Sequence, residues 1–219
     1  MNPAPVGRLL TELYHILWEA LGPQGWWPGD TPFEVALGAI LTQNTNWNNV
    51  AQAITMIKDR GLLTPQALHE LPEAELARLI RPAGYYNIKA RRVKDFLDFL
   101  ATRYQNSMAR MATANLAALR PELLGVKGIG PETADSILLY ALNKPTFVVD
   151  AYTFRILSRH GLVPEACPYE DLRQLFMEHL PVQVPQYQEY HALLVRVGKE
   201  WCRPQPRCES CPVAGWPDI

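Results

Sequence analysis

The stretch LGVKGIGPETAD at residues 124–135 decides the fold of this chain. Gly128 and Gly130 permit the positive φ and close approach of a tight turn between two helices, and Pro131 suits the start of the second helix. Such a turn offers free backbone N–H groups, which can hold a phosphate with help from the helix dipole. By itself the stretch could equally be an ordinary helix connector, because short glycine motifs are weak evidence.

An aspartate follows this turn between an apolar run and a helical pattern. Asp150 comes eighteen residues after Glu132, at the end of the apolar, strand-like run Phe147-Val148-Val149 and just before a helical pattern. An aspartate there is expected to cap the helix, and capping alone would explain an isolated residue. Together with the glycine turn, it indicates an anion-binding site with an acid or base beside it.

Composition limits the class of protein. The 219 residues, 48% hydrophobic and 20% charged, suffice for one sizeable domain or two small lobes. No apolar run approaches the roughly 20 residues of a membrane span, and the first residues lack a signal-peptide pattern, so we expect a cytoplasmic protein. The net charge of −1 argues against a wholly basic nucleic-acid binder, so any DNA contact must be local. One local basic cluster exists at residues 89–94.

Apolar residues recur at helical spacing along the chain, with Pro and Gly between the segments, which predicts an all-α fold without a sheet. We expect the proline-containing tail after Trp201 to be irregular. The expected helices cover residues 5–20, 32–42, 47–60, 65–70, 73–80, 87–104, 114–119, 122–126, 131–142, 151–160, 169–180 and 185–200.

Three tryptophans could stack on a base. Trp26 and Trp27 lie in a loop between the first two expected helices, and Trp47 follows a segment rich in amides and hydroxyls that begins at Gln43. Indole faces stack on bases, most strongly on cationic ones. The amide groups can read a base edge or fill a gap in a duplex. The alternative is that the tryptophans are core residues and the polar groups are helix caps.

A second aromatic segment, residues 81–89, carries paired tyrosines directly before the basic cluster. Tyr85 at such a tip could wedge into a base step while Lys89 and the arginines after it hold phosphate. The alternative is a tyrosine packed over its own loop with solvated charges behind it.

Three cysteines gather near the end of the sequence, at Cys202, Cys208 and Cys211, with Cys167 far upstream. In a cytosolic protein this spacing favours metal or iron–sulfur ligation over disulfides. A zinc or cubane site usually takes four ligands. The fourth could be Cys167, Asp218 or the terminal carboxylate, and a metal-free loop is the alternative.

The turn at 126–130, the run Val148-Val149-Asp150 and the cysteine tail resemble the helix-hairpin-helix (HhH-GPD) DNA glycosylase superfamily, specifically the endonuclease III family. The segments around Trp26, Gln43 and Asp150 are most similar to the bacterial 3-methyladenine DNA glycosylase branch related to endonuclease III. The resemblance covers nearly the whole chain. It implies two helical lobes, a six-helix lobe at 32–144 and a second lobe of 1–31 plus 145–219, with a base-accepting cleft between them.

The resemblance also assigns chemistry. Asp150 matches the family's catalytic aspartate. Endonuclease III carries, two residues after the last hairpin glycine, a lysine that attacks C1′ of the sugar; here that position is Glu132. A carboxylate cannot form an imine, so we expect a monofunctional glycosylase in which water is the nucleophile.

We expect the enzyme to act as a monomer on double-stranded DNA containing damaged bases, in the cytoplasm and, in a bacterium, at the nucleoid. The flipped base would enter a cleft lined by Trp26, Trp27 and Trp47. Six residues are expected to contact DNA: Gln43, Tyr85, Lys89, Lys127, Gly128 and Gly130.

The cysteine tail departs from the family pattern, which has six residues in its first gap and a fourth cysteine further on. This chain has five residues between Cys202 and Cys208 and no cysteine after Cys211. A [4Fe–4S] cluster is therefore an expectation drawn from resemblance alone. Two other functions stay open: a bifunctional pyrimidine-lesion glycosylase/lyase, and a non-catalytic DNA-binding module in which Asp150 only caps its helix.

Overall fold

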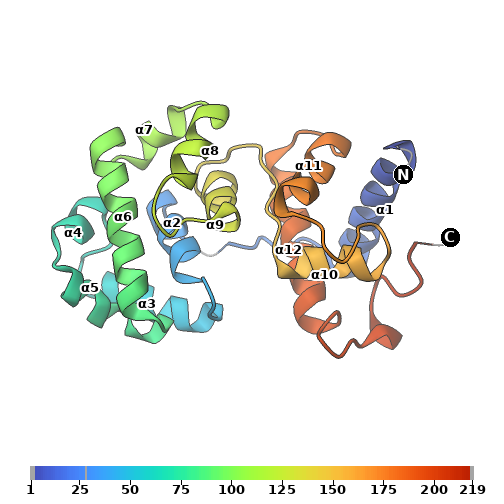
Figure 1. Cartoon of the computed structure of the whole chain (residues 1–219). Helices are drawn as coiled ribbons and strands as arrows, with labels where there is room; N and C mark the ends of the chain where they lie inside the picture. Colours follow the sequence, from blue (N-terminus) through green and yellow to red (C-terminus); the bar gives the residue numbers. More distant parts are fainter. Residues whose placement is uncertain (1–2, 28, 218–219) are drawn as a thin grey trace. The chain divides into compact units, whose positions relative to one another are not determined.

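The structure, a computed structural model, describes residues 3–27 and 29–217 and confirms the all-α prediction, because this part of the chain contains helices and no strand (Figure 1). The elements in chain order are α1 (Pro3–Leu21), α2 (Pro32–Leu41), α3 (Trp47–Lys58), α4 (Pro65–Glu70), α5 (Glu73–Leu79), η1 (Arg81–Ala83), α6 (Tyr86–Tyr104), α7 (Met108–Thr113), α8 (Leu116–Leu124), α9 (Pro131–Ser136), η2 (Ile137–Ala141), α10 (Ala151–Arg159), α11 (Tyr169–His179), α12 (Val184–Glu200) and η3 (Cys208–Ser210).

Two elements differ from the sequence prediction. α7 was not expected, because its six residues bury only Met108 and Met111, too short a pattern to show a period. α8 is one helix where two were predicted at 114–119 and 122–126. It continues through Pro121 because Leu119 and Leu123, four residues apart, are both fully buried, so packing outweighs the missing N–H.

The chain divides into two compact units, each described by itself. The hairpin unit spans 27–144, and the Asp150 unit comprises the residues up to Trp26 and from Pro145 onward. The sequence places the start of the first lobe at 32, a few residues later than the hairpin unit begins.

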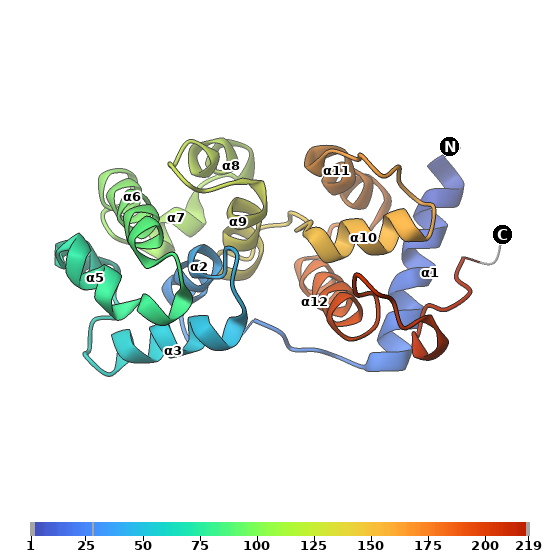
Figure 2. The ribbon, with the colours of Figure 1, turned by 60° about the horizontal axis from the view of Figure 1, so that its bottom comes forward.

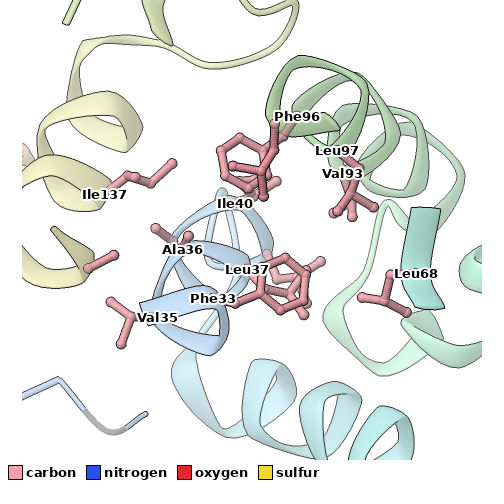
Figure 3. Close-up of a cluster of buried hydrophobic side chains, with 14 of the residues drawn as sticks. Phe33, Val35, Ala36, Leu37, Ile40, Leu68, Val93, Phe96, Leu97 and Ile137 are labelled. Carbon is pink, nitrogen blue, oxygen red and sulfur yellow. The ribbon is translucent and has the colours of Figure 1, made fainter. Parts of the chain in front are cut away.

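The hairpin unit is built around α2, whose residues from Phe33 to Leu41 are all buried. α3, α6, α9 and η2 pack around this helix. Figure 3 shows Ile40 of α2 next to Phe96 of α6, while Ala36 lies on the side of Ile137. A helix that is apolar on all sides must be central. Its C-terminal end therefore holds the Gln43 segment against the rest of the unit.

An ion pair fastens the two helices of the hairpin. Arg120 of α8 donates two hydrogen bonds to the carboxylate of Asp135 of α9, at 2.8 and 2.9 Å, and Asp135 is fully buried. Removing one partner of such a buried pair typically costs about 3 to 5 kcal/mol, because the other charge stays in a low-dielectric site. This ion pair therefore holds the two helices together and, with them, the turn that joins them.

The Asp150 unit packs α10 and α11 with α1 and α12 (Figure 2). Its core centres on Phe147, which stacks on Phe176 at 3.9 Å between ring centroids and meets Tyr190 edge-on. The strand-like run before Asp150 is buried but pairs with no strand among the described residues, so the alternation in sequence reflects core packing. This buried segment anchors the start of α10.

Candidate functional site

The hairpin turn is exposed and tightly shaped. Lys127, Gly128 and Gly130 are exposed, whereas Val126 and Ile129 are buried beneath them. Gly128 has φ +84°, and a Cβ there would lie 2.4 Å from Cγ of Arg92. Only glycine fits this position, because both the conformation and the space exclude a side chain. The turn faces outward next to the start of α9, as an anion-binding turn requires.

Gln43 is bound to this turn. Its Nε2 donates to the carbonyl of Gly128 (3.1 Å) and to Oγ1 of Thr133 (2.9 Å), and its Oε1 accepts from Arg92. The predicted DNA-contacting residue therefore lies beside the hairpin, although it is 85 residues away in sequence. To fill a gap in a duplex, its amide would exchange these bonds for bonds to bases.

Lys89 is buried, which contradicts the prediction that its amine holds phosphate. The residue is 1% exposed, and its Nζ donates to the carbonyls of Leu41 (2.8 Å) and Ala83 (2.7 Å). Burial, with a smaller effect of the nearby Arg92 charge, lowers the pKa of Lys89 to about 8. Its amine joins the end of α2 to η1, so it supports the segments that lead to Gln43 and Tyr85.

Tyr85 is exposed, as a wedge must be. Its side chain is 68% exposed, and its backbone is left-handed, with φ 45° and ψ 33°, just before α6. A non-glycine residue in this conformation is strained by about 1 to 2 kcal/mol. Strain of this kind is frequent at functional sites and is informative when observed. Tyr86 is half-buried under the guanidinium of Arg81, so it contributes to the loop rather than to the tip.

Two of the three tryptophans form an aromatic cluster in the hairpin unit. Trp27 stacks on Tyr140 at 4.5 Å and meets Trp47 edge-on at 6.1 Å. The Trp47 ring lies against Gly38 of α2, where an added Cβ would approach it to 3.2 Å. Tyr140 comes from η2, a π-helical turn that continues α9, and such turns occur frequently at functional sites. Sequence reasoning missed Tyr140, which looked like one apolar residue of a regular helix.

The third tryptophan, Trp26, belongs to the Asp150 unit. Its ring lies 5.5 Å from the ring of His191, and Nζ of Lys199 lies 5.6 Å from its centroid. Trp26 is half-buried, so one part of the indole is accessible. Each unit thus presents indole surface, as a base-stacking role requires.

Asp150 is the N-cap of α10. Its Oδ1 accepts from the backbone N–H of Thr153 (2.7 Å) and from Oγ1 of Thr153 (2.9 Å), and its side chain is 11% exposed. Burial alone would raise the pKa of Asp150, but His191 and the bonds from Thr153 outweigh it and lower the pKa below its usual range. The carboxylate is therefore charged at neutral pH and held in place through Oδ1.

His191 is the functional candidate that sequence reasoning missed. It lies on α12, is 3% exposed, and places Nε2 3.7 Å from Oδ2 of Asp150. In the sequence it is one polar residue within an apolar helical face, which is usually a core histidine. Only the packing of α12 against α10 brings it to the aspartate.

Glu132 is exposed in the first turn of α9, two residues after Gly130. A carboxylate suits the positive end of a helix dipole, so the residue has a structural reason to be there. No amine is available at this position.

The cysteines do not assemble a four-ligand site in the described residues. Cys202 and Cys208 are near enough to Cys211 for their charges to raise its thiol pKa, an effect smaller than that of burial. Cys167 lies by Pro168 and Asp171. Within residues 3–27 and 29–217, no group of three or more His, Cys, Asp or Glu side chains is arranged to hold a metal. Asp218 and the terminal carboxylate lie outside the described residues. The donors among the described residues form no such site, and the [4Fe–4S] cluster stays a prediction.

No helix in the described part of the chain has the length and apolar character needed to cross a membrane.

Comparison with known proteins agrees with this architecture. A protein of Methanocaldococcus jannaschii that is named as a DNA repair glycosylase is 45% identical over 207 residues, 94% of each chain. The crystal structure of Helicobacter pylori 3-methyladenine DNA glycosylase (MagIII) bound to 1,N6-ethenoadenine superimposes with a TM-score of 0.75 at 27% identity, covering 91% of this chain and 98% of that one. A non-covalent endonuclease III–DNA complex shares the fold, with a TM-score of 0.79 at 21% identity over 94% and 92% of the two chains. The model of the HhH-GPD superfamily of base excision DNA repair proteins matches residues 37–182, and the chain belongs to this DNA glycosylase family.

Proposed function

We propose that this protein is a monofunctional DNA glycosylase that hydrolyses the N-glycosidic bond of damaged bases, most favourably of N-alkylated purines such as 3-methyladenine. The observation that carries the proposal is the Asp150 carboxylate, which is held through Oδ1, is 11% exposed and has a pKa below its usual range. Because position 132 carries a glutamate and no amine, we propose a glycosylase without lyase activity.

In this mechanism the bond between C1′ and the base nitrogen breaks, and the base leaves with the bonding electrons. Positive charge develops on the sugar, where Asp150 stabilises it electrostatically. Water then bonds to C1′, and its proton passes to Asp150 or to solvent. A base that is already cationic leaves readily, so little general-acid help is needed.

Recognition of the flipped base would come from aromatic stacking. Trp27 and Trp47 are held at fixed angles by Tyr140 and Gly38, so they offer planar surface at low entropic cost. A cationic base gains extra attraction from such rings, at about 0.5 to 2 kcal/mol. The 1,N6-ethenoadenine bound to MagIII is a purine derivative, and this supports a purine substrate for the present chain as well.

DNA binding would use the exposed turn and the tip. Gly128 and Gly130 would offer backbone N–H groups to a phosphate with Lys127 beside them, and Tyr85 would enter the base stack. Gln43, attached to the same turn, would take the place of the flipped base. One chain supplies all of these groups, so we propose that a monomer acts on the duplex.

The test is Asp150→Asn in a lesion-panel assay that measures base release and strand cleavage separately. Excision should fall by at least about 100-fold, because the neutral amide cannot stabilise the sugar cation, while DNA affinity stays within about twofold. Asp59→Asn, an exposed residue at the end of α3, is the matched control and should excise normally.

Three outcomes would contradict the proposal. Retained excision by Asp150→Asn would remove the residue from catalysis. An enzyme–DNA adduct trapped by borohydride would indicate the glycosylase/lyase. Absence of base release from every lesion substrate would leave the non-catalytic DNA-binding module.

A further inference from the structure

The two oxygens of the Asp150 carboxylate have different surroundings. Oδ1 accepts both bonds from Thr153, at 2.7 and 2.9 Å, whereas Oδ2 faces Nε2 of His191 at 3.7 Å. A separation of 3.7 Å is too long for a hydrogen bond but short enough for the polar edge of the imidazole to interact electrostatically with the carboxylate. Oδ1 is therefore committed to the helix cap, and His191 is the side chain next to Oδ2.

The position of His191 is fixed by helix packing. α10 and α12 approach so closely at Gly198 that an added Cβ would lie 2.4 Å from the ring of Tyr152. Arg155 of α10 adds a bond to the carbonyl of Gly198, at 3.0 Å. Both elements lie in the Asp150 unit, and the imidazole is 3% exposed. The close packing of these helices therefore holds the backbone of His191 near Asp150.

A charged group faces the imidazole, and another lies against the aromatic ring that the imidazole contacts. Asp150 faces it from the start of α10, and Lys199 of its own helix lies on the Trp26 ring that the imidazole contacts. Burial of the carboxylate by itself favours the neutral acid, and the interactions with His191 and Thr153 together outweigh it. A neutral acid could not stabilise a sugar cation.

We infer that His191 is a positioning residue for the proposed glycosylase reaction: its imidazole, 3.7 Å from Oδ2, holds the carboxylate of Asp150 in place for the reacting sugar. This inference rests on the proposed function, in which Asp150 is the catalytic group. His191 itself touches no reacting atom. Its contribution should appear in the pH dependence of excision, because without it the buried carboxylate takes up a proton at a higher pH.

The experiment compares wild type, His191→Leu and His191→Gln in single-turnover release of 3-methyladenine from methylated duplex DNA, across a pH series. Leucine removes the polar imidazole at similar volume, and glutamine places an amide N–H near the position of Nε2. For His191→Leu, the acidic limb of the rate profile should move up by about one pH unit, so that the rate at a given pH below the limb falls about tenfold. His191→Gln should restore most of the rate and the wild-type limb, and DNA affinity should be unchanged in both.

A purely structural role predicts something else. It would lower the rate of both variants equally at every pH, with the limb in place, and that result would overturn the inference. A melting curve for each variant shows whether it is folded. If His191→Leu does not fold, His191→Asn, whose shorter amide does not reach Oδ2, replaces it with the same expected shift.

Failure of the inference is separable from failure of the proposed function. No base release by wild type, or excision by Asp150→Asn, would contradict the function whatever His191 does. Excision by wild type and not by Asp150→Asn, with an unshifted limb in His191→Leu, would contradict the inference alone.

Discussion

At the residue scale, the site depends on side chains whose backbone or surroundings are unfavourable by themselves. Asp150 stays charged although it is nearly buried, because Thr153 and His191 compensate for the lost solvent. Tyr85 stays in a left-handed conformation although it makes no capping bond. Such costs persist where surrounding structure holds the residue in place, and they mark candidate functional positions.

The strain at Tyr85 gives a prediction in which stability and activity move in opposite directions. Tyr85→Asn should raise the free energy of unfolding by about 1 kcal/mol, because asparagine tolerates the left-handed region. It should lower excision about tenfold, because the wedge is lost. Urea unfolding and single-turnover excision measure the two effects. Tyr85→Phe keeps the ring and should match wild type in both; equal excision by Tyr85→Asn would show that Tyr85 is no wedge.

At the element scale, α6 organises the segments that face outward from the hairpin unit. Lys89 near its start binds the carbonyls of Leu41 and Ala83, and Arg92, one turn later, binds Gln43, which in turn binds the hairpin. Lys89 and Arg92 were expected to lie on a phosphate-binding surface. Both instead connect segments of the hairpin unit through hydrogen bonds. The Gln43 segment, the Tyr85 tip and the hairpin turn are connected through one helix.

Lys89→Met should show both parts of this role. The pKa of Lys89 is about 8 in the folded protein and 10.5 ordinarily, so between these values the unfolded chain binds more protons and stability rises with pH. The full cost of the buried charge, about 3 kcal/mol by order of magnitude, is present below pH 8 and is relieved above about 10.5. Urea unfolding from pH 7 to 10 should show this rise in wild type and its loss in Lys89→Met.

The same variant should excise more slowly at neutral pH, because Leu41 and Ala83 lose their common donor. Lys94→Met is the matched control, since Lys94 of the same helix binds the carbonyls of Leu68 and His69 instead. Its excision rate should be near that of wild type. If the free energy of unfolding changes with pH equally in wild type and Lys89→Met, the amine of Lys89 does not cause the pH dependence.

The two hairpin glycines offer a matched pair. Gly128→Ala should lose about 1 to 3 kcal/mol and weaken DNA binding, because φ is +84° and Arg92, held by Gln43, occupies the space of the new Cβ. Gly130→Ala should stay within about 1 kcal/mol of wild type, since φ is −89° and no atom lies within 4 Å of the added Cβ. Thermal unfolding and DNA titration compare them. Equal losses would mean that the turn does not need glycine at 128.

At the scale of the whole molecule, the net charge of −1 gives no general attraction to DNA, so affinity must come from a few local contacts. In such a protein a single cation should contribute measurably to the affinity for DNA. Lys127→Ala should weaken binding equally for all duplex sequences and reduce the slope of log affinity against log salt by about one. Arg110→Ala, an exposed cation on α7 that binds Gln105, should leave the slope unchanged. An unchanged slope for Lys127→Ala would place the phosphate elsewhere.

Much of the fold was predictable from sequence because helix formation is governed by local spacing. The apolar period predicted nearly all helices, and it failed only where packing overrode local rules, at Pro121, or where the pattern was too short, at α7. The hairpin turn and the cap at Asp150 are also local, and the structure shows both.

The site was less predictable, because its contacts join residues that are far apart in sequence. A lysine in a basic run is usually solvated, and only the path of α2 and η1 shows that Lys89 is buried between two carbonyls. The contacts of Tyr140 with Trp27 and of His191 with Asp150 were unpredictable for the same reason, because each joins residues far apart in sequence.

By itself the sequence determined that this chain is all-α, that it carries a glycine hairpin followed by a capping aspartate, and that an acid stands at 132, because each of these depends on neighbouring residues. Only the tertiary structure decided which groups are exposed and which charges meet. Those properties depend on how helices pack, which brings His191 of α12 to Asp150 at the start of α10 and removes Lys89 from water.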